Sequence, residues 1–478
     1  MKKALLIITM CAAAFPALSQ WSVDSLINVC ANDAVSTYQQ KTMFVNYGSW
    51  ELYDLQTQNS VTGFLSLGRN SIQVATVRNV AYFGGGQYGP YTDPVYTNNV
   101  DVYDFVSNTW TLSKLSRARE VGAAAAIGNK ILFAGGRDAI NMYNTVDIFD
   151  VRTGARTTAK LSKARTNISV AVNGNKVVFA GGWYFDFSYN RPASNAVDIY
   201  DASTGLWSTA TLSQKRQGMS VASVGTKILF AGGIPNSGGT NRVDIYDVAT
   251  NAWSTASLSA QRSSMTVNVI GSKAYFASGI GASNKIDVYD AASNSWSVVT
   301  MPYNLVGAAG AVVNNQVFYA GGYDPSTYAV SNALQIYNTA TNSWTTGIIS
   351  QARASSNVVS IGNITIFAGG FTKVTYPAVG STRLDIYNAV PGFIAKTNTF
   401  DFTFFPNPVL NEINFSVNKE SKFPVLVRLY NDKGNEVATY RVVSESTRIF
   451  IGNVPKGKYF LSACDDGKNC VSKIIFKL

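Results

Sequence analysis

The sequence predicts an all-β protein, a ring of repeated four-stranded units followed by a small β-sandwich. Three observations lead to this expectation: a short pattern recurs along most of the chain, short β-branched and aromatic segments alternate with turn residues, and the pattern stops after Pro391. The chain has 478 residues, which is too long for one ordinary compact domain. Its composition, 46% hydrophobic and 14% charged residues, excludes a disordered chain.

The recurring pattern has three parts, which one stretch of the chain illustrates. An aromatic residue followed by Asp, at Tyr103, is followed seven residues later by Trp110. Arg119 lies 16 residues after Tyr103, and the pair Gly135 and Gly136 begins 16 residues after Arg119. Both 16-residue spacings hold in every unit, although Leu305 replaces the arginine once. A constant spacing of this kind indicates a repeated structural unit.

Only the segment between the glycine pair and the next aromatic residue varies in length. Counted from the first glycine or its equivalent, it runs from 11 to 19 residues. Four short strands per unit are typical of a β-propeller blade, so each blade has one loop of free length, where function usually lies. The units resemble kelch repeats over roughly residues 21–390, which implies a kelch-type β-propeller.

The N-terminal segment is expected to close the ring. WSVDSLINVC, from Trp21 to Cys30, matches the segment that begins at Trp253, and the last unit has no tryptophan strand after Tyr387. A pairing between the strand at Trp21 and the strand around Tyr387 therefore removes an exposed sheet edge. Eight blades are favoured and seven remain the alternative; the eight units begin at Cys30, Arg69, Arg119, Arg165, Arg216, Arg262, Leu305 and Arg353.

The two ends of the chain indicate export. Residues 1–19 have Lys2 and Lys3 before an apolar run, which predicts a cleaved signal peptide, and no later segment is long enough to span a bilayer. Residues 20–395 are assigned to the propeller and 396–478 to the sandwich. The sandwich segment, with its PNP, GKY and final basic strand, resembles the sorting domain of type IX secretion cargo. That resemblance implies the type IX machinery as a partner and a location on the cell surface or outside the cell.

Two cysteines of the C-terminal segment are expected to form a disulfide. Cys464 and Cys470 flank a five-residue turn, and export to an oxidising space favours the bond. Asp465 and Asp466 within this turn supply too few ligands for a metal ion, so a solvated turn is the preferred interpretation. No metal and no cofactor are expected.

Several function classes are excluded by composition. The chain contains no histidine, so a Ser-His pair or a histidine metal ligand is impossible, and so is the copper site of galactose oxidase. The formal net charge of +11 is spread along the chain without a run of basic residues, which argues against nucleic-acid binding.

Some acidic residues lie outside the repeat pattern and could be catalytic, so an enzyme remains the alternative function. Most acidic residues of the propeller recur with the period and are therefore expected to be structural. The exceptions are Asp24, Asp33, Asp93, Glu120, Asp138, Asp186 and Asp324. A secreted carbohydrate-active enzyme, glycosidase or sialidase-like, remains the alternative function, although no catalytic residue is assigned.

The preferred function is the binding of a glycan or a protein through the variable loops, which are rich in aromatic residues. The candidate ligand-binding residues there are Tyr88, Tyr91, Trp183, Tyr184, Phe185, Tyr189, Tyr323 and Tyr328. The interpretation that these rings only pack the loops remains open.

A ring of guanidinium groups at one channel mouth, suited to an anionic ligand, is a second candidate site. Its members are the periodic Arg69, Arg119, Arg165, Arg216, Arg262 and Arg353. Structural pairing with the repeat aspartates is the preferred alternative for these arginines.

Overall fold

The structure is a computed structural model that describes residues 21–26, 34–55, 57, 59–90, 92–186, 190–281, 284–376, 378–389, 402–406, 408–417, 423–431, 436–464 and 470–478. The expected signal segment 1–19, Cys30 and the expected domain boundary near residue 395 lie outside these residues. The described residues form strands, turns and irregular segments; they contain no helix that is long and apolar enough to cross a membrane.

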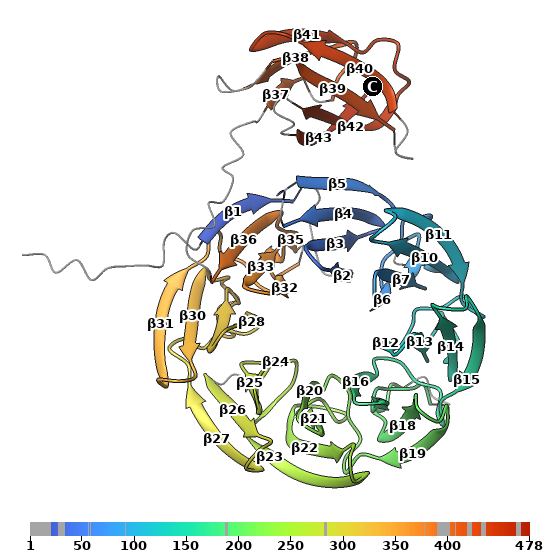
Figure 1. The fold of residues 1–478 in the computed structure, drawn as a ribbon, viewed down its shortest axis with the longest axis vertical. Coiled ribbons are helices and arrows are strands. Elements are labelled where there is room, and N and C mark those ends of the chain that lie inside the picture. The colour runs from blue at the N-terminus through green and yellow to red at the C-terminus, as the bar shows by residue number, and fades with distance from the viewer. Residues whose placement is uncertain are drawn as a thin grey trace, which may run out of the picture.

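In the described part of the chain, eight four-stranded antiparallel sheets are arranged around a common axis as the blades of a β-propeller (Figure 1). Within each blade the strands follow one another in chain order from the axis outwards, and only the last blade departs from this order. The all-β fold and the favoured count of eight blades are thereby confirmed.

The first four blades contain the following strands. Blade 1 consists of β2 (Ala34–Tyr38), β3 (Lys41–Asn46), β4 (Ser49–Asp54) and β5 (Asn59–Phe64). Blade 2 consists of β6 (Gln73–Val77), β7 (Val80–Gly84), β10 (Asn99–Asp104) and β11 (Thr109–Lys114), with the small hairpin of β8 (Gln87–Tyr88) and β9 (Val95–Tyr96) in its loop. Blade 3 consists of β12 (Ala123–Ile127), β13 (Lys130–Ala134), β14 (Thr145–Asp150) and β15 (Arg156–Lys160). Blade 4 consists of β16 (Ser169–Asn173), β17 (Lys176–Ala180), β18 (Ala196–Asp201) and β19 (Trp207–Thr211).

The remaining blades repeat this arrangement. Blade 5 consists of β20 (Ser220–Val224), β21 (Lys227–Ala231), β22 (Thr240–Asp247) and β23 (Ala252–Arg262). Blade 6 consists of β24 (Thr266–Ile270), β25 (Lys273–Ala277), β26 (Lys285–Asp290) and β27 (Ser295–Thr300). Blade 7 consists of β28 (Ala309–Val313), β29 (Gln316–Ala320), β30 (Ala333–Asn338) and β31 (Ser343–Ile348). Blade 8 consists of β32 (Asn357–Ile361), β33 (Ile364–Ala368), β36 (Arg383–Asn388) and β1 (Trp21–Ser25), with β34 (Phe371–Lys373) and β35 (Val379–Gly380) in its loop.

The middle strands of each blade are buried on both faces by the neighbouring blades. In β13 the run from Ile131 to Ala134 is fully buried, which explains why it is continuously apolar rather than alternating. One hydrophobic cluster joins Leu132 of blade 3 to Val177 and Phe179 of blade 4, and equivalent clusters join the other neighbours. The core therefore lies between blades, so a blade depends on its neighbours for burial.

Strand β1 closes the ring by pairing with β36 in blade 8, as the sequence predicts. Trp21 lies opposite Tyr387 in the antiparallel register. Leu26, 4% exposed, continues the ladder by donating its amide to the Thr382 carbonyl at 2.6 Å. In Figure 1 the blue β1 lies beside the orange β36, so the first described strand completes the last blade.

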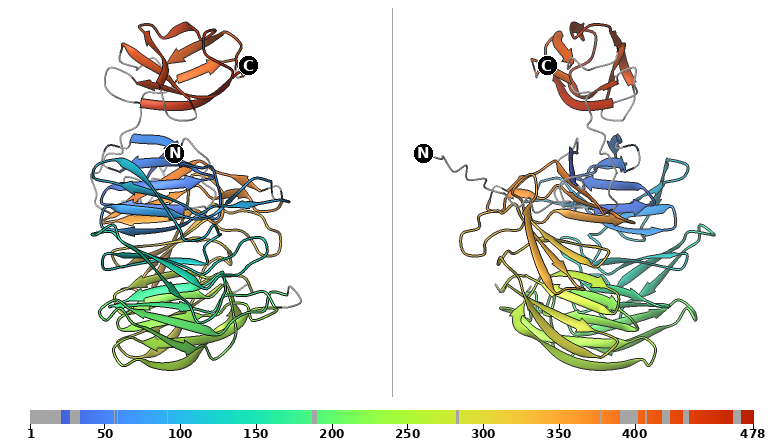
Figure 2. Two further views of the ribbon diagram at one scale, coloured as in Figure 1. Left: turned by 90° about the vertical axis from the view of Figure 1, so that its right-hand side faces the viewer. Right: turned by 60° about the vertical axis from the view of Figure 1, so that its left-hand side comes forward.

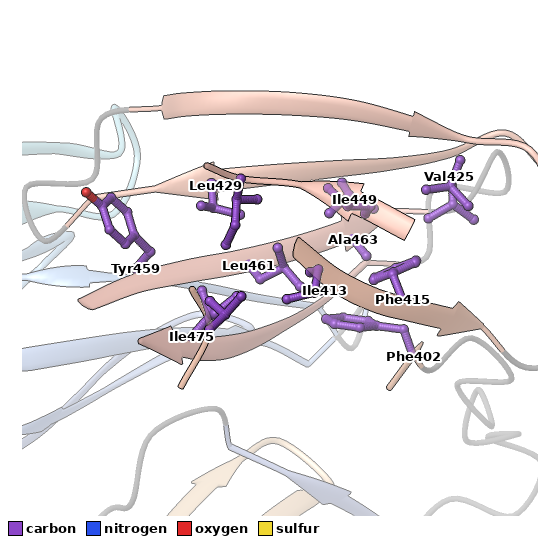
Figure 3. Packing of buried hydrophobic residues seen from close by; sticks show 14 of the residues in the cluster. Phe402, Ile413, Phe415, Val425, Leu429, Ile449, Tyr459, Leu461, Ala463 and Ile475 are labelled. Carbon is purple, nitrogen blue, oxygen red and sulfur yellow. The ribbon is translucent and has the colours of Figure 1, made fainter. Parts of the chain in front are cut away.

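The C-terminal segment forms a β-sandwich of two sheets. One sheet contains β37 (Phe402–Phe405), β38 (Glu412–Val417) and β41 (Ser446–Phe450); the other contains β40 (Glu436–Val442), β39 (Val425–Tyr430), β42 (Gly457–Cys464) and β43 (Cys470–Lys477). Its core includes Phe402, Ile413, Phe415, Leu429 and Leu461, which lie between the sheets in Figure 3. Inward residues alternate along β39, as expected for a strand with one buried face.

Deletion of residues 20–28 is expected to destabilise the whole ring, because it exposes the edge of β36 and removes Leu26 from the cluster between blades 8 and 1. The midpoint of thermal unfolding measures the effect. Val23, 51% exposed on β1, provides the control, since Val23→Ala should leave the midpoint almost unchanged. A deletion variant that unfolds within a degree or two of the full chain would contradict the role assigned to β1.

Candidate functional site

The loops of variable length lie on one face of the propeller. Because successive strands of a blade alternate in direction, the loops between the second and third strands emerge at the same end as the connections between blades. We call this end the loop face; for blades 3 and 4 its described loop residues are 135–144, 181–186 and 190–195. Figure 2 shows the ring from the side, with loops at both faces.

Short bridges extend the two inner strands of a blade at the loop face. In blade 3, Glu120, which follows the periodic arginine, pairs with Arg137, which follows the glycine pair. The equivalent pairs are Asn70 and Gln87, Thr166 and Trp183, Gln217 and Ile234, Ser263 and Ile280, Val306 and Tyr323, and Ala354 and Phe371. In these blades the rim pairs therefore position the residue that directly follows the glycine pair or its equivalent.

The glycine pair is required by the close approach of two backbone segments. Gly135 and Gly136 have φ values of +63° and +106°. A Cβ atom on Gly136 would lie 2.0 Å from the Glu120 carbonyl oxygen, and one on Gly135 would lie 2.5 Å from that of Arg165 in the next blade. The Gly136 amide donates to the same Arg165 carbonyl at 2.9 Å. The pair thus joins blade 3 to the connection that enters blade 4.

The six periodic arginines are buried inside the blades, with 0 or 1% of their surface exposed. Each forms an ion pair with the aspartate of the third strand. The pairs are Arg69 and Asp101 at 2.8 Å, Arg119 and Asp147 at 2.9 Å, Arg165 and Asp198 at 2.7 Å, Arg353 and Asp385 at 2.5 Å, Arg216 and Asp244, and Arg262 and Asp287.

Blade 3 shows how the arginine is held. The Arg119 Nε donates to the Gly135 carbonyl at 2.8 Å and Nη2 donates to the Phe133 carbonyl at 3.2 Å. The other oxygen of Asp147 accepts the Ser116 amide at 2.8 Å, so the ion pair joins the connection between blades to two strands of the sheet. Burial lowers the pKa of Arg119, and the Asp147 carboxylate opposes that shift.

These contacts correct the expectation that the arginines ring a channel mouth and bind a ligand. The guanidinium groups of Arg69, Arg119, Arg165, Arg216, Arg262 and Arg353 donate to backbone carbonyls and carboxylates within their own blades, away from solvent. The preferred alternative, structural pairing with the repeat aspartates, is confirmed. Sequence spacing revealed the period but not the direction in which the side chains point.

Blade 7 replaces both members of the ion pair by neutral residues. Leu305 occupies the arginine position, and Gln335 occupies the aspartate position. The Gln335 Oε1 accepts the Tyr303 amide at 2.8 Å, as the aspartate oxygen does in the other blades. The hydrogen bond to the connection is kept while both charges are lost together.

Removing one charge of a buried ion pair should lower the free energy of unfolding more than removing both charges of that pair. Asp147→Ala leaves the Arg119 cation buried without its partner, so we expect a loss of about 3–5 kcal/mol in the free energy of unfolding. The double variant Arg119→Leu, Asp147→Gln copies blade 7 and should lose at most about 2 kcal/mol. Chemical denaturation measures both. If the double variant is the less stable of the two, the pair does not act as a unit.

Trp183 is not the exposed anchor that the sequence suggests, because only 9% of its surface is exposed. It forms bridges to Thr166 and to Ala193, and Phe185 packs edge-on against it at 5.4 Å. Tyr184 and Phe185 are half-buried. Trp183 therefore supports the blade 4 loop, in agreement with the interpretation that the loop rings pack the loops.

The exposed candidates are Tyr88 and Tyr328, at 37% and 56% exposure. Tyr88 lies on β8 in the loop of blade 2. Tyr328 stacks on the half-buried Tyr323, with ring centroids 5.9 Å apart and an interplanar angle of 14°. The structure thus brings Tyr323 and Tyr328 together. The other two candidates, Tyr91 and Tyr189, lie outside the described residues.

The loop carrying Tyr328 is held by an aspartate turn. The Asp324 carboxylate accepts the amides of Ser326 and Thr327 at 2.8 and 2.9 Å, and the hydrogen bonds of Ser326 and Thr327 lower its pKa to about 2. Tyr328 has φ +59°, a conformation that costs a non-glycine residue free energy, and its amide donates to the Asp324 carbonyl. The turn and the ring stack together hold an exposed aromatic ring in one position.

Two of the non-periodic acidic residues lie close to the rim pair of blade 3. Glu120 forms an ion pair with Arg137 at 3.1 Å, and Asp138 accepts a hydrogen bond from the Tyr143 hydroxyl. Burial raises the pKa of Asp138, but the hydrogen bonds from Tyr143 and Asn141 bring it below its usual value. Among the described residues, no group of three or more Cys, Asp or Glu side chains is placed to hold a metal ion.

The remaining acidic candidates are dispersed. Asp186 accepts the Asn190 amide within the blade 4 loop, and Asp324 belongs to the turn described above. Asp24 lies on β1 and accepts the Tyr53 hydroxyl at 3.1 Å. Asp93 lies in the blade 2 loop, while Asp33 is outside the described residues.

Sequence reasoning missed four cations that lie over aromatic rings on the loop face. Arg137 and Arg191 both lie over Trp183, at 5.8 and 5.0 Å from its ring centroid. Lys163 lies 3.2 Å from the Tyr184 ring centroid, and Arg117 lies 5.7 Å from that of Tyr143. One available signal was that Arg137 occupies the rim position that Trp183 and Tyr323 occupy in other blades.

In the sandwich, Cys464 is disulfide-bonded and lies directly opposite Cys470 in the pairing of β42 with β43. This register is compatible with a bond between these two cysteines. The side chain of Cys470 lies outside what the structure describes.

Comparison with known proteins agrees with both parts of the fold. A family model of the kelch motif matches residues 215–257, and a model of the secretion system C-terminal sorting domain matches residues 403–477. A solved structure titled "Structure of YjhT" is similar at 14% identity, with a TM-score of 0.39, over 58% of this chain and 99% of that chain. No curated protein matches the chain.

The chain is a kelch-repeat β-propeller with a type IX secretion sorting domain. The sorting domain directs the protein to the outer cell surface or out of the cell, through interaction with the secretion machinery.

Proposed function

We propose that the propeller is a non-catalytic binding module that holds a glycan, or alternatively a protein, against its loop face. The polar groups that recur with the repeat, above all the arginine and aspartate pairs, are used inside the blades. The groups that differ from blade to blade are concentrated in the variable loops. Such a division between a constant scaffold and one variable face is typical of a binding scaffold.

The observation that carries the proposal is the stacked pair of Tyr323 and Tyr328. An exposed ring that is already held in place loses little conformational entropy when a ligand packs on it. The flat face of a tyrosine suits the apolar face of a sugar ring, and its hydroxyl remains available for hydrogen bonds. Tyr328 therefore has the properties of a ligand anchor rather than of a packing residue.

A secreted carbohydrate-active enzyme is the second candidate. It is favoured by the proximity of Glu120, Arg137, Asp138 and Tyr143 in blade 3, because carboxylates beside a tyrosine and an arginine are used in glycoside cleavage. Against it, Glu120 is held by Arg137, and Asp138 accepts two backbone amides of its own loop. We therefore propose that these residues stabilise the loop and do not act in catalysis.

A glycan array probed with the mature full-length protein tests the binding function. We expect Tyr328→Ala to weaken binding by about 1–3 kcal/mol, with little effect on the thermal midpoint. Tyr376, on the loop of blade 8 and 98% exposed, provides the control: Tyr376→Ala should change binding little, because no aromatic ring among the described residues packs against this side chain. Equal losses in the two variants, or none in either, would contradict the role of the stacked pair.

A turnover screen with the glycans that bind separates the two candidate functions. Release of cleaved sugar that is abolished by Glu120→Gln or Asp138→Asn would favour the enzyme. Binding without turnover favours the binding module.

Removing residues 400–478 should separate export from folding. The core of the sandwich is made from its own residues, so the truncated chain is expected to keep a folded propeller and to accumulate in the periplasm. Cell fractionation and thermal unfolding measure the two properties. Normal amounts of truncated protein outside the cell would contradict the sorting role of this segment.

A further inference from the structure

The aromatic rings in the loops of blades 3 and 4 are covered by cations. Arg137 and Arg191 lie over Trp183, and Lys163 lies over Tyr184. Arg117 lies over Tyr143 on the adjoining loop. A ligand that approaches this part of the loop face therefore meets guanidinium and ammonium groups before it meets a ring. We call Arg117, Arg137, Lys163 and Arg191 the cation cluster.

Among the described residues, the carboxylates near these loops form an ion pair with one member of the cluster, Arg137. Glu120 pairs with Arg137, Asp138 accepts hydrogen bonds from Tyr143 and Asn141, and Asp186 accepts both the amide and the side-chain nitrogen of Asn190. Among the ion pairs of the described residues, none includes Arg117, Lys163 or Arg191. Three cations thus lack a carboxylate partner, while the nearby anions are used within their own loops.

The surroundings of the cluster suit a polysaccharide better than a protein. Protein interfaces depend on buried apolar anchors, and in the described loops of blades 3 and 4 Ile140 is the one exposed large hydrophobic residue. Asn141, Asn167 and Asn190 are also exposed, and their side-chain oxygens can accept hydrogen bonds from sugar hydroxyls.

We infer that the ligand at this place is an acidic polysaccharide, whose sulfate or carboxylate groups are bound by Arg117, Lys163 and Arg191. A guanidinium group presents a planar pair of donors that matches either anion, and an ammonium group adds three donors. The rings below them restrict the motion of the cations, so less entropy is lost on binding. This inference rests on the proposed binding function and adds the chemical class of the ligand.

The test compares polymers that differ in charge, using the mature full-length protein. Dextran and dextran sulfate share a backbone and differ in sulfate, polygalacturonate supplies carboxylates, and poly-glutamate supplies an acidic polypeptide. We expect dextran sulfate or polygalacturonate to bind at least about tenfold more tightly than dextran, with an affinity that falls as salt is added. The stronger of the two identifies sulfate or carboxylate as the preferred anion.

A charge-matched pair of variants distinguishes the cluster from the general charge of the protein. Lys163→Gln with Arg191→Gln removes two cations from the cluster, and we expect it to lower the affinity about tenfold or more. Arg152→Gln with Arg156→Gln removes two exposed cations after the third strand of blade 3, at the opposite face, and should change the affinity less than about twofold. Thermal midpoints of both variants confirm that they fold.

Four results would overturn the inference. Equal losses in the two double variants would show attraction to net charge alone. Poly-glutamate binding as tightly as the polysaccharides, with the same dependence on Lys163 and Arg191, would identify an acidic polypeptide instead. Binding of a neutral glycan or of a protein that depends on Tyr328, with no gain for acidic polymers, would overturn the acidic ligand while leaving the binding function in place. If none of the probes, glycans or proteins binds, the proposed function fails as well.

Discussion

The buried ion pair between an arginine and an aspartate organises the propeller. In blade 3, Arg119 bonds the first glycine of its own pair, and the second glycine donates its amide to the carbonyl of Arg165 in blade 4. Side-chain and backbone bonds therefore alternate from blade to blade. Burying both charges is costly, but each is hydrogen-bonded as well as paired, and the loss of one partner would leave an unpaired charge in the interior.

Blades 1 and 7 lack the arginine–aspartate pair, and blade 7 shows which of its hydrogen bonds is kept. Blade 7 keeps the acceptor for the amide of the connection, through Gln335, and gives up both charges. Blade 1 keeps a buried acid, since Glu51 lies opposite Phe44 where Asp147 lies opposite Phe133. Its loop is reduced to the turn at Tyr47 and Gly48, so the blade that departs most from the repeat also contributes least to the loop face. In every blade described in full, a side chain of the third strand accepts a backbone amide of the connection that enters the blade. A blade can lose the charge pair or the long loop and still form.

The fold could be predicted from the sequence because it is indicated by constant spacings between residues along the chain. A constant separation between Tyr103, Arg119 and Gly135 predicts equivalent positions in successive blades, and the unmatched strand at Trp21 predicts the closing pair. The site did not follow in the same way, because exposure depends on how each loop folds back. Trp183 and Tyr328 are both loop aromatics in sequence, yet bridges to Thr166 and Ala193 bury the first, and an aspartate turn presents the second to solvent.

The position of β1 in blade 8 has a consequence for the order in which the molecule forms. The first strand of the described residues, which follows the expected signal segment 1–19, has its partner in the last blade of the ring. Blades 1 to 7 each pair strands that follow one another along the chain, so they can form as the chain emerges. Closure has to wait until β36 is present. A nascent or prematurely terminated chain is consequently an open arc with an unpaired edge, and only a chain extending at least through β36 becomes a ring. The pairing of β1 with β36 thus distinguishes complete propellers from shortened ones, because a chain that ends before β36 lacks the strand with which β1 must pair.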